Sequence, residues 1–357
     1  ISTVELIREN VKLPEVPYAG IIDEKSAVGY VKLNSFTNTA SQNVETAIRE
    51  LQNEGMSKLI LDLRGNGGGL LNEAVNIVNF FIDKNTVVVE TKGRVEEVNR
   101  TYSTQNQPWN TEMPVVVLID GYSASASEIV AGSLQDLDRG VVIGMNSYGK
   151  GLVQQTKNLQ YNAKVKLTIA KYYTPSGRCI QRLDYSDVND DGRGTAVEDS
   201  LITLFKTKNG RDVKDGRGID PDVVVEPGMY SRLTGTLIGK SLIFDYATIF
   251  RHKYDSIQSA KSFRVNNEIY TDFTNFLKDK NYEYKNESEE YLAAFTDVAK
   301  EEKYYEDTKS EIEALRSKLT ADKSVDLERY QEEIIELLEN EIVSRYYYQN
   351  GRIEASV

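Results

Sequence analysis

The segment Lys58-Leu-Ile-Leu-Asp-Leu-Arg-Gly-Asn-Gly-Gly-Gly69 decides the fold class of this chain. Its first half, residues 58–63, is a short apolar run of the kind that forms a strand buried in a parallel sheet. The second half is a glycine-rich turn, and residues 70–82 then carry apolar side chains at helical spacing. The sequence therefore predicts a strand, a turn and a helix in direct succession.

The same order recurs on both sides of this segment. Strands are expected over 27–36, 115–119 and 141–143, and helices over 41–54 and 125–137. Such alternation predicts an α/β layered core with a parallel sheet. We further expect a strand pair around Gly93 and β-rich structure over 150–175, whereas the polar residues 184–199 favour an inserted loop.

The chain of 357 residues is long enough for two or three domains of about 150 residues each. Amphipathic helical patterns dominate after Pro227-Gly228. We therefore expect an α/β core over 17–227 and a mainly helical C-terminal domain over 228–357. Residues 1–16 contain one short strand pattern, at 3–8, and are interpreted as the end of a preceding domain.

Composition excludes several classes of protein. The net charge of −12 argues against nucleic acid or an anionic membrane as a partner, because both require a basic surface. No apolar run approaches the ~18 to 20 residues of a membrane span. One cysteine excludes an internal disulfide framework. The single histidine, His252, lies in a helical pattern of the C-terminal domain, so a Ser-His-Asp site has only one remote candidate for its imidazole.

Ser125 is the first candidate for chemistry. In the segment Val117–Val130, a buried strand runs through small residues into a helix, and Ser125 stands at the start of that helix. Free backbone N–H groups and the helix dipole stabilise developing negative charge at such a position. The alternative is a capping box, in which Ser125 is the N-cap and Glu128 occupies the third helical position.

A serine nucleophile needs a base, and Lys150 is the best-placed candidate. It stands between two glycines in Ser147-Tyr-Gly-Lys-Gly151, directly after the strand at 141–143. A lysine acts as a base where apolar surroundings lower its pKa, but an ordinary surface lysine is the alternative. The glycine turn at 65–69 lets backbone N–H groups approach a ligand, although a plain tight turn fits it as well.

Several motifs together resemble the C-terminal processing (tail-specific) serine peptidases, over about residues 1–227. They are Asp62-Leu-Arg-Gly-Asn66, Ser123-Ala-Ser-Ala-Ser-Glu-Ile129, Gln135-Asp136, Tyr148-Gly-Lys-Gly151 with Gln154, and Gly218-Ile-Asp-Pro-Asp-Val223. The resemblance implies a crotonase-like layered core and an endopeptidase that cleaves near the C-terminus of unfolded or tail-exposed proteins. It also implies a location in the periplasm or cell envelope, and it identifies residues 1–16 as the remnant of a PDZ-like domain.

The resemblance assigns a role to each matched residue. Ser125 is implied as the nucleophile of a Ser/Lys dyad, Lys150 as the general base, and Gln154 as the residue that orients the lysine amine. The N–H groups of Gly68 and Ala126 are implied as the oxyanion hole. The resemblance implies no cofactor. Asp136 also matches the family motif, but it lies about three helical turns beyond Ser125, so we interpret it as structural.

Other interpretations remain open at this stage. A non-catalytic peptide-binding or scaffolding protein is the main alternative, and an acyl-CoA enzyme is disfavoured because the glycine turn lacks basic surroundings. The C-terminal domain is a candidate surface for homo-oligomerisation. A weak calcium-loop pattern consists of Asp187, Asn189, Asp191 and Glu198.

Overall fold

The computed structural model describes residues 5, 7–9, 13–189, 191, 194–320 and 322–357. The chain divides into two compact units, Ile1–Glu226 and Pro227–Val357. The boundary expected from the sequence, after residue 227, lies one residue from this division. Residues 3, 4 and 6 of the strand expected at 3–8 lie outside the described residues, so the interpretation of residues 1–16 stays a prediction.

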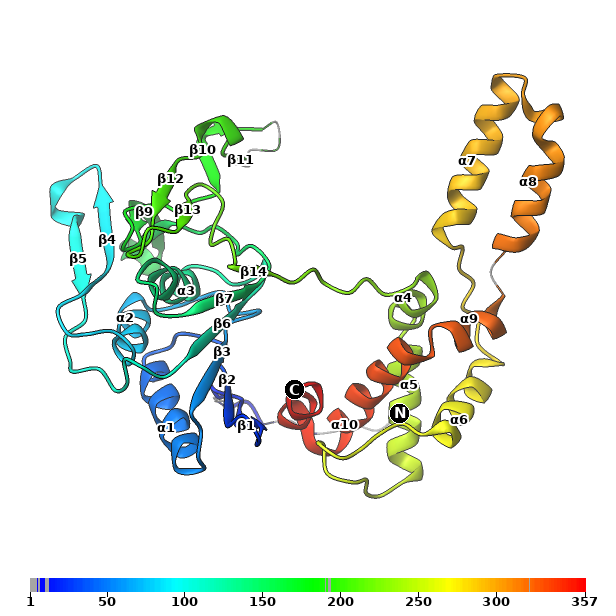
Figure 1. The fold of residues 1–357 in the computed structure, drawn as a ribbon, viewed down its shortest axis with the longest axis horizontal. Helices are drawn as coiled ribbons and strands as arrows, with labels where there is room; N and C mark the ends of the chain where they lie inside the picture. The colour runs from blue at the N-terminus through cyan, green and yellow to red at the C-terminus, as the bar shows by residue number, and fades with distance from the viewer. Residues whose placement is uncertain (1–4, 6, 10–12, 190, 192–193, 321) are drawn as a thin grey trace. The chain divides into compact units, whose positions relative to one another are not determined.

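A six-stranded sheet forms the centre of the first unit (Figure 1). Four neighbouring strands are parallel, the antiparallel β1 covers one edge, and the short parallel β14 covers the other. The order across the sheet is β1 (Tyr18–Asp23), β2 (Val28–Lys32), β3 (Lys58–Asp62), β6 (Val115–Ile119), β7 (Val141–Gly144) and β14 (Val223–Val224). The layered α/β core predicted from the sequence is confirmed.

Three helices cover one face of this sheet: α1 (Ala40–Asn53), α2 (Leu71–Asn79) and α3 (Ala126–Asp136). Each lies between two parallel strands, and the strands follow one another across the sheet in chain order. Because such crossovers are right-handed, all three helices fall on the same side. Side-chain burial agrees, since Leu59 and Leu61 of β3 are buried while Ile60 between them is only half-buried.

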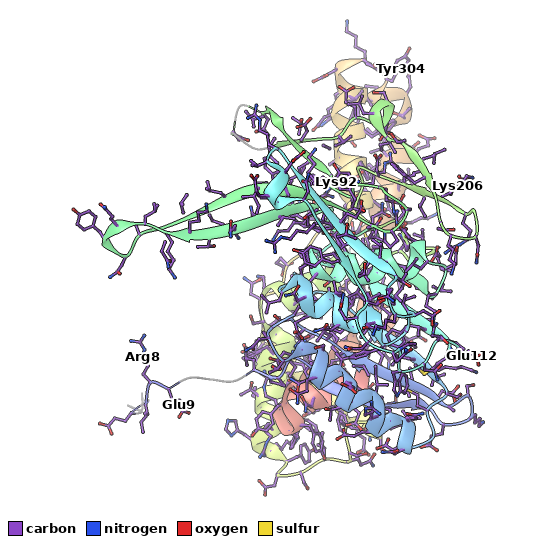
Figure 2. The ribbon with its side chains drawn as sticks, turned by 90° about the vertical axis from the view of Figure 1, so that its left-hand side faces the viewer. Arg8, Glu9, Lys92, Glu112, Lys206 and Tyr304 are labelled. Atoms are coloured by element: carbon purple, nitrogen blue, oxygen red, sulfur yellow. The ribbon has the colours of Figure 1, made fainter. Side chains whose placement is uncertain are left out.

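A second sheet has the order β5-β4-β9-β8. Its strands are β4 (Val87–Gly93), β5 (Arg100–Ser103), β8 (Leu152–Asn158) and β9 (Lys164–Tyr173). The β8–β9 hairpin extends beyond the neighbouring strands (Figure 2), and Tyr161 at its tip is 98% exposed. Because β8 is the edge strand, one side of its backbone is left unpaired within this sheet.

The polar segment at 184–199, expected as a loop, instead contains a short antiparallel hairpin of β10 (Leu183–Val188) and β11 (Gly194–Ala196). A second small hairpin follows, β12 (Leu204–Lys206) with β13 (Asp212–Lys214). Three of these four strands have only three residues each, fewer than the roughly four to eight over which alternation identifies a half-buried strand.

The second unit is helical, as predicted. Its elements are α4 (Arg232–Gly239), α5 (Leu242–Lys253), α6 (Asn267–Leu277), α7 (Glu287–Glu301), α8 (Tyr305–Leu319), α9 (Lys323–Arg329) and α10 (Gln331–Ser356). Aromatic rings fill much of its core, with Tyr246 against Phe250 and Phe273. No helix in the described part of the chain is both long and apolar enough to cross a bilayer.

A buried ion pair joins α3 to the segment that follows β9. Arg178 donates to the carboxylate of Asp136 over 2.8 Å, and both side chains have no exposed surface. The Ser176 N–H also donates to Asp136, over 3.1 Å. The guanidinium further donates to the side chain of Gln135 and the carbonyl of Lys214. The carboxylate of Asp136 is thus buried and hydrogen-bonded to Arg178 and Ser176, in agreement with the interpretation of Asp136 as a structural residue.

We expect Asp136→Asn to destabilise the fold, because it leaves the buried Arg178 charge without its partner. The loss should be about 3–5 kcal/mol in the free energy of unfolding, measured by urea denaturation. The matched control is Asp212→Asn, which removes an ion pair with Lys206 whose side chains are 59% and 63% exposed. That control should lose less than about 1 kcal/mol. Equal losses in the two variants would contradict the structural role of Asp136.

Candidate active site

Three loops meet at one edge of the central sheet. They follow β3, β6 and β7, which are adjacent and parallel, so their carboxyl ends lie side by side. The loop after β3 is the glycine turn, the loop after β6 ends at Ser125, and the loop after β7 carries Lys150. The topology therefore brings together three segments that are separated by 25 or more residues in the chain. Ligand sites of open α/β sheets lie at this edge.

Ser125 adopts a backbone conformation that non-glycine residues rarely take, with φ 56° and ψ −110°. It is the N-cap of α3 and forms a capping box with Glu128. The Ser125 N–H donates to the Glu128 carboxylate over 2.7 Å. The capping interpretation and the candidate nucleophile are thus compatible. A conformation that costs about 1–3 kcal/mol persists only where surrounding contacts hold it, as at many functional sites.

The glycine turn packs directly against the Ser125 loop. Gly68 has φ 93°, and a Cβ atom there would lie 2.5 Å from the carbonyl oxygen of Ala124. Only glycine fits this close approach. The buried Asn66 holds the turn, because its carbonyl accepts from Ala124 N–H and from the hydroxyl of Ser127. Its carboxamide donates to the carbonyl of Leu33 over 2.8 Å.

Glu128 connects the Ser125 loop with the Lys150 loop. Its side chain is completely buried and accepts four hydrogen bonds. Burial raises the pKa of the Glu128 carboxyl, whereas its hydrogen bonds act in the opposite direction. The four donors are the N–H of Ser125 at 2.7 Å, the hydroxyl of Ser147 at 2.5 Å, and the N–H groups of Gly149 at 2.6 Å and Lys150 at 2.9 Å.

Tyr172 on β9 makes a second connection between the same loops. Its hydroxyl donates to the carbonyl of Lys150 and lies 3.2 Å from the carbonyl of Ser125. Burial, with a further contribution from the charge of Glu128, holds the pKa of the Tyr172 phenol well above its usual range. The phenol therefore stays protonated and serves as a donor.

A pocket of about 460 Å³ opens where these loops meet. It brings together all five residues that the sequence predicts for the site: Gly68, Ser125, Ala126, Lys150 and Gln154. Gln154 lies on β8 and lines the pocket from there. The pairing of β8 with β9 is irregular between Val153 and Gln154. The rest of the lining is mainly apolar and comes from the glycine turn, α2, α3 and the β8–β9 hairpin. Lys166 is a second lysine at the pocket.

The two expected oxyanion donors differ in their present partners. The N–H of Gly68 donates to the side-chain oxygen of Asn66 over 2.9 Å. The N–H of Ala126, at the first position of α3, has no acceptor among the described residues, as is usual for the first turn of a helix. One donor is therefore available in this arrangement, and the other is occupied within the glycine turn.

Three residues that shape the site were not identified as such from the sequence: Asn66, Glu128 in its role between the loops, and Tyr172. The Asp-Leu-Arg-Gly-Asn and Ser-Glu motifs contain the first two, but their partners come from distant segments. His252 lies exposed on α5 of the second unit.

The structure describes only part of the proposed calcium loop. Asp190 and Gly192 of this pattern lie outside the described residues. Among the residues that are described, no group of three or more His, Cys, Asp or Glu side chains is placed to hold a metal ion. The calcium loop therefore stays a prediction.

Comparison with known families identifies the class of protein that this fold and site define. Residues 27–191 match the profile of peptidase family S41. Residues 233–357 match a second profile, described as "Probable PDZ-protease, C-terminal helical domain". Within the first unit, residues 27–191 are therefore similar to the peptidases of family S41.

Individual relatives extend this result. The chain is 38% identical over 182 residues to a "Carboxy-terminal-processing protease" of Bartonella bacilliformis, covering 50% of this chain and 41% of the relative. It is 32% identical over 283 residues to a "Probable CtpA-like serine protease" of Staphylococcus aureus, covering 78% of this chain and 54% of the relative. The chain thus spans about half the length of these curated relatives. A solved structure titled "Photosystem II D1 C-terminal processing protease" matches with a TM-score of 0.45 and 28% identity, covering 62% of this chain and 50% of that chain.

We expect Glu128→Ala to destabilise the first unit strongly. Four donors would lose their acceptor in a site without solvent, so the free energy of unfolding should fall by about 3–5 kcal/mol in urea denaturation. Glu73→Ala is the matched control, because the half-buried Glu73 accepts from a single N–H group, that of Ser41. It should lose about 1 kcal/mol. A loss at Glu128 no larger than at Glu73 would show that the two loops do not depend on this carboxylate.

Proposed function

We propose that the chain is a serine endopeptidase that uses Ser125 as nucleophile and Lys150 as general base. The observation that carries the proposal is the single pocket of about 460 Å³, which gathers Ser125, Lys150 and the glycine turn from three separate loops. The family assignment and the names of the relatives support a serine peptidase. No ion pair of Lys150 is found in the described part of the chain, so its amine is not committed to a carboxylate.

The proposed reaction begins with transfer of the Ser125 hydroxyl proton to the neutral amine of Lys150. The Ser125 oxygen then bonds to the carbon of the peptide carbonyl, whose oxygen becomes an oxyanion. The N–H of Ala126 at the start of α3 stabilises this charge, together with the helix dipole. The N–H of Gly68 joins it once it exchanges the Asn66 side chain for the oxyanion.

Completion of the reaction returns the proton. The amine of Lys150 donates it to the leaving amine as the peptide C–N bond breaks, which leaves an acyl ester on Ser125. The same lysine then takes a proton from water, whose oxygen bonds to the ester carbon, and it returns this proton to the Ser125 oxygen as the acyl C–O bond breaks. We assign Gln154 the task of orienting the lysine amine, because it reaches the same pocket from β8.

An extended polypeptide fits the surroundings of the pocket. The edge strand β8 presents unpaired backbone groups beside it, and Leu152 and Val153 of that strand line it. Edge strands bind extended peptides by main-chain hydrogen bonds, which are independent of the peptide sequence. We therefore propose unfolded or tail-exposed proteins, cleaved near their C-terminus, as substrates. Location in the periplasm or cell envelope stays a prediction.

One observation favours the second candidate, a protein that binds peptides without cleaving them. The N–H of Gly68 is occupied by Asn66, so the oxyanion hole has one available donor in this arrangement. A chain fixed in this arrangement would retain the peptide-binding edge of β8 but stabilise the oxyanion poorly.

Hydrolysis of casein by purified protein tests the dyad. Ser125→Ala and Lys150→Ala should each lower the rate at least ~10³-fold, because the first removes the proposed nucleophile and the second removes the proposed base. Lys164→Ala, on the same hairpin as Gln154, and His252→Ala are the controls and should keep the wild-type rate. Cleavage by Lys150→Ala at the wild-type rate would refute the assignment of the base.

A fluorophosphonate probe separates the two candidate functions. An enzyme should form one covalent adduct, located at Ser125 by mass spectrometry and absent from Ser125→Ala. Saturable binding of denatured casein without an adduct and without cleavage would instead establish the peptide-binding protein.

We further propose that copies of the chain associate through α7. Tyr291, Phe295 and Val298 form an exposed apolar stripe at positions i, i+4 and i+7 of this helix. Its first turn is acidic and its last turn carries Lys300. Antiparallel pairing of two α7 helices about a twofold axis would place each acidic end against a lysine of the other copy.

Sedimentation velocity tests this association. Phe295→Glu should shift the wild-type dimer to monomer, raising the dissociation constant at least ~10-fold, because it places a charge in the apolar stripe. Val325→Glu is the matched control, since Val325 on α9 is 47% exposed, close to the 55% of Phe295, but lies outside the stripe. A monomeric wild type, or a dimer that Phe295→Glu leaves intact, would contradict the proposal.

A further inference from the structure

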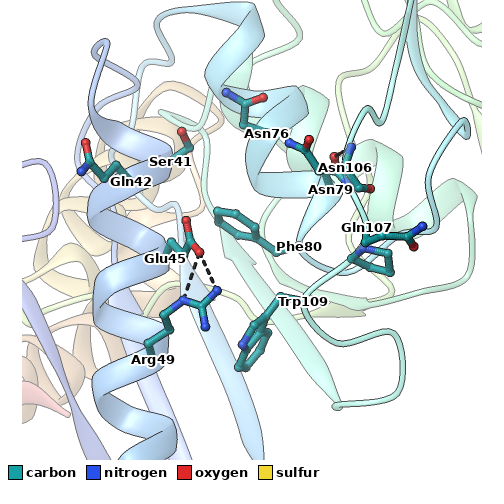
Figure 3. Close-up of a pocket in the computed structure, with 11 residues that line it drawn as sticks. Ser41, Gln42, Glu45, Arg49, Asn76, Asn79, Phe80, Asn106, Gln107 and Trp109 are labelled. Carbon is teal, nitrogen blue, oxygen red and sulfur yellow. Dashed lines mark hydrogen bonds and ion pairs between the residues drawn. The ribbon is translucent and has the colours of Figure 1, made fainter.

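A second pocket lies on the first unit, among α1, α2 and the loop that precedes β6 (Figure 3). Its volume is about 590 Å³, within the range of about 300–1,000 Å³ that is usual for small-molecule sites. It shares no lining residue with the pocket that contains Ser125. We propose that this pocket binds a neutral saccharide.

The polar lining is rich in carboxamides. Gln42 on α1, Asn76 on α2, and Asn106 and Gln107 on the loop are among the lining residues labelled in Figure 3. None of these four side chains makes a hydrogen bond to another described residue. A carboxamide offers a donor and an acceptor at once, and so does a sugar hydroxyl. The lining thus provides several neutral partners for a ligand that carries many hydroxyl groups.

The charges of the pocket cancel locally. Its two charged residues, Glu45 and Arg49, lie one turn apart on α1 and form an ion pair of 2.7 Å. The Arg49 guanidinium also donates through its Nε atom to the same carboxylate oxygen. A phosphate or carboxylate ligand would compete with Glu45 for this guanidinium. The electrostatics therefore favour an uncharged ligand.

Two aromatic rings complete the pocket. Phe80 and Trp109 are both partly exposed at its wall. The negatively charged face of an aromatic ring attracts C–H groups, and a pyranose ring has one face made largely of C–H groups. The rings and the carboxamides together match the two sides of a sugar, one apolar and one bearing hydroxyls.

The loop that contributes Trp109 is fixed before any ligand arrives. The buried Asn79 accepts from the N–H groups of Gln105 and Asn106 and donates to the carbonyl of Asn106. The carbonyl of Phe80 accepts from Trp109 N–H over 2.9 Å. Such fixation lowers the entropy that binding must remove from the protein.

Trp109 is the only tryptophan of the chain, so its fluorescence reports on this pocket directly. We expect titration of the full chain with N,N′,N″-triacetylchitotriose to change the emission in a saturable manner, with a dissociation constant of about 0.1–1 mM. Gln42→Ala and Asn106→Ala should each weaken binding about three- to tenfold, because each removes hydrogen bonds to the sugar. Gln52→Ala, an exposed glutamine on α1 outside the pocket, should bind as the wild type does.

The variants must also unfold at the wild-type urea concentration, so that lost binding reports on the pocket. Ser125→Ala should bind the trisaccharide with wild-type affinity, because the two pockets have no residue in common. The absence of a saturable signal up to ~50 mM trisaccharide would overturn the proposal. Equal affinity of the wild type and both pocket variants would overturn it as well.

Discussion

The geometry of the active-site candidate depends on one buried carboxylate. Glu128 accepts from the N–H of Ser125 on one side and from the N–H groups of Gly149 and Lys150 on the other. No cation shares this site among the described residues, so dipoles alone compensate the charge. A buried charge requires such compensation, and the requirement fixes the donors in space. The Ser125 loop and the Lys150 loop therefore share one hydrogen-bond acceptor.

Asn66 has a comparable role for the glycine turn. It is buried, and its groups contact the loops that follow β2 and β6 as well as its own turn. The parallel sheet supplies the framework, because adjacent strands deliver their loops to one edge. The polar groups of Asn66 and Glu128 then set the distances between loops that hydrophobic packing alone leaves free. Glycine-rich loops have few side chains that could pack against one another. The hydrogen bonds of Asn66 and Glu128 hold these loops together instead.

Sequence periodicity predicted α1, α3 and the strands β3, β6 and β7, because each has its own apolar pattern of sufficient length. It missed β1, whose residues 18–23 include Ala19 and Gly20 and show no clear alternation. The motifs that resemble the family identified Ser125, Lys150 and the glycine turn, and the structure places them around one pocket. Tyr172 was out of reach, because its role arises from hydrogen bonds to residues 22 and 47 positions away. Nothing local to β9 encodes them.

The Ser125 loop and the glycine turn differ in how their hydrogen bonds are arranged before a substrate binds. The rare backbone conformation of Ser125 is already held by Glu128 and Tyr172, so its cost of about 1–3 kcal/mol is met before substrate arrives. The two proposed oxyanion donors differ, because the Gly68 N–H donates to the side chain of Asn66 in this arrangement. A positive φ at Gly68 permits a small rotation of this peptide without a steric penalty from a side chain. On the proposed mechanism, the complete site therefore requires the exchange of one hydrogen bond within the glycine turn.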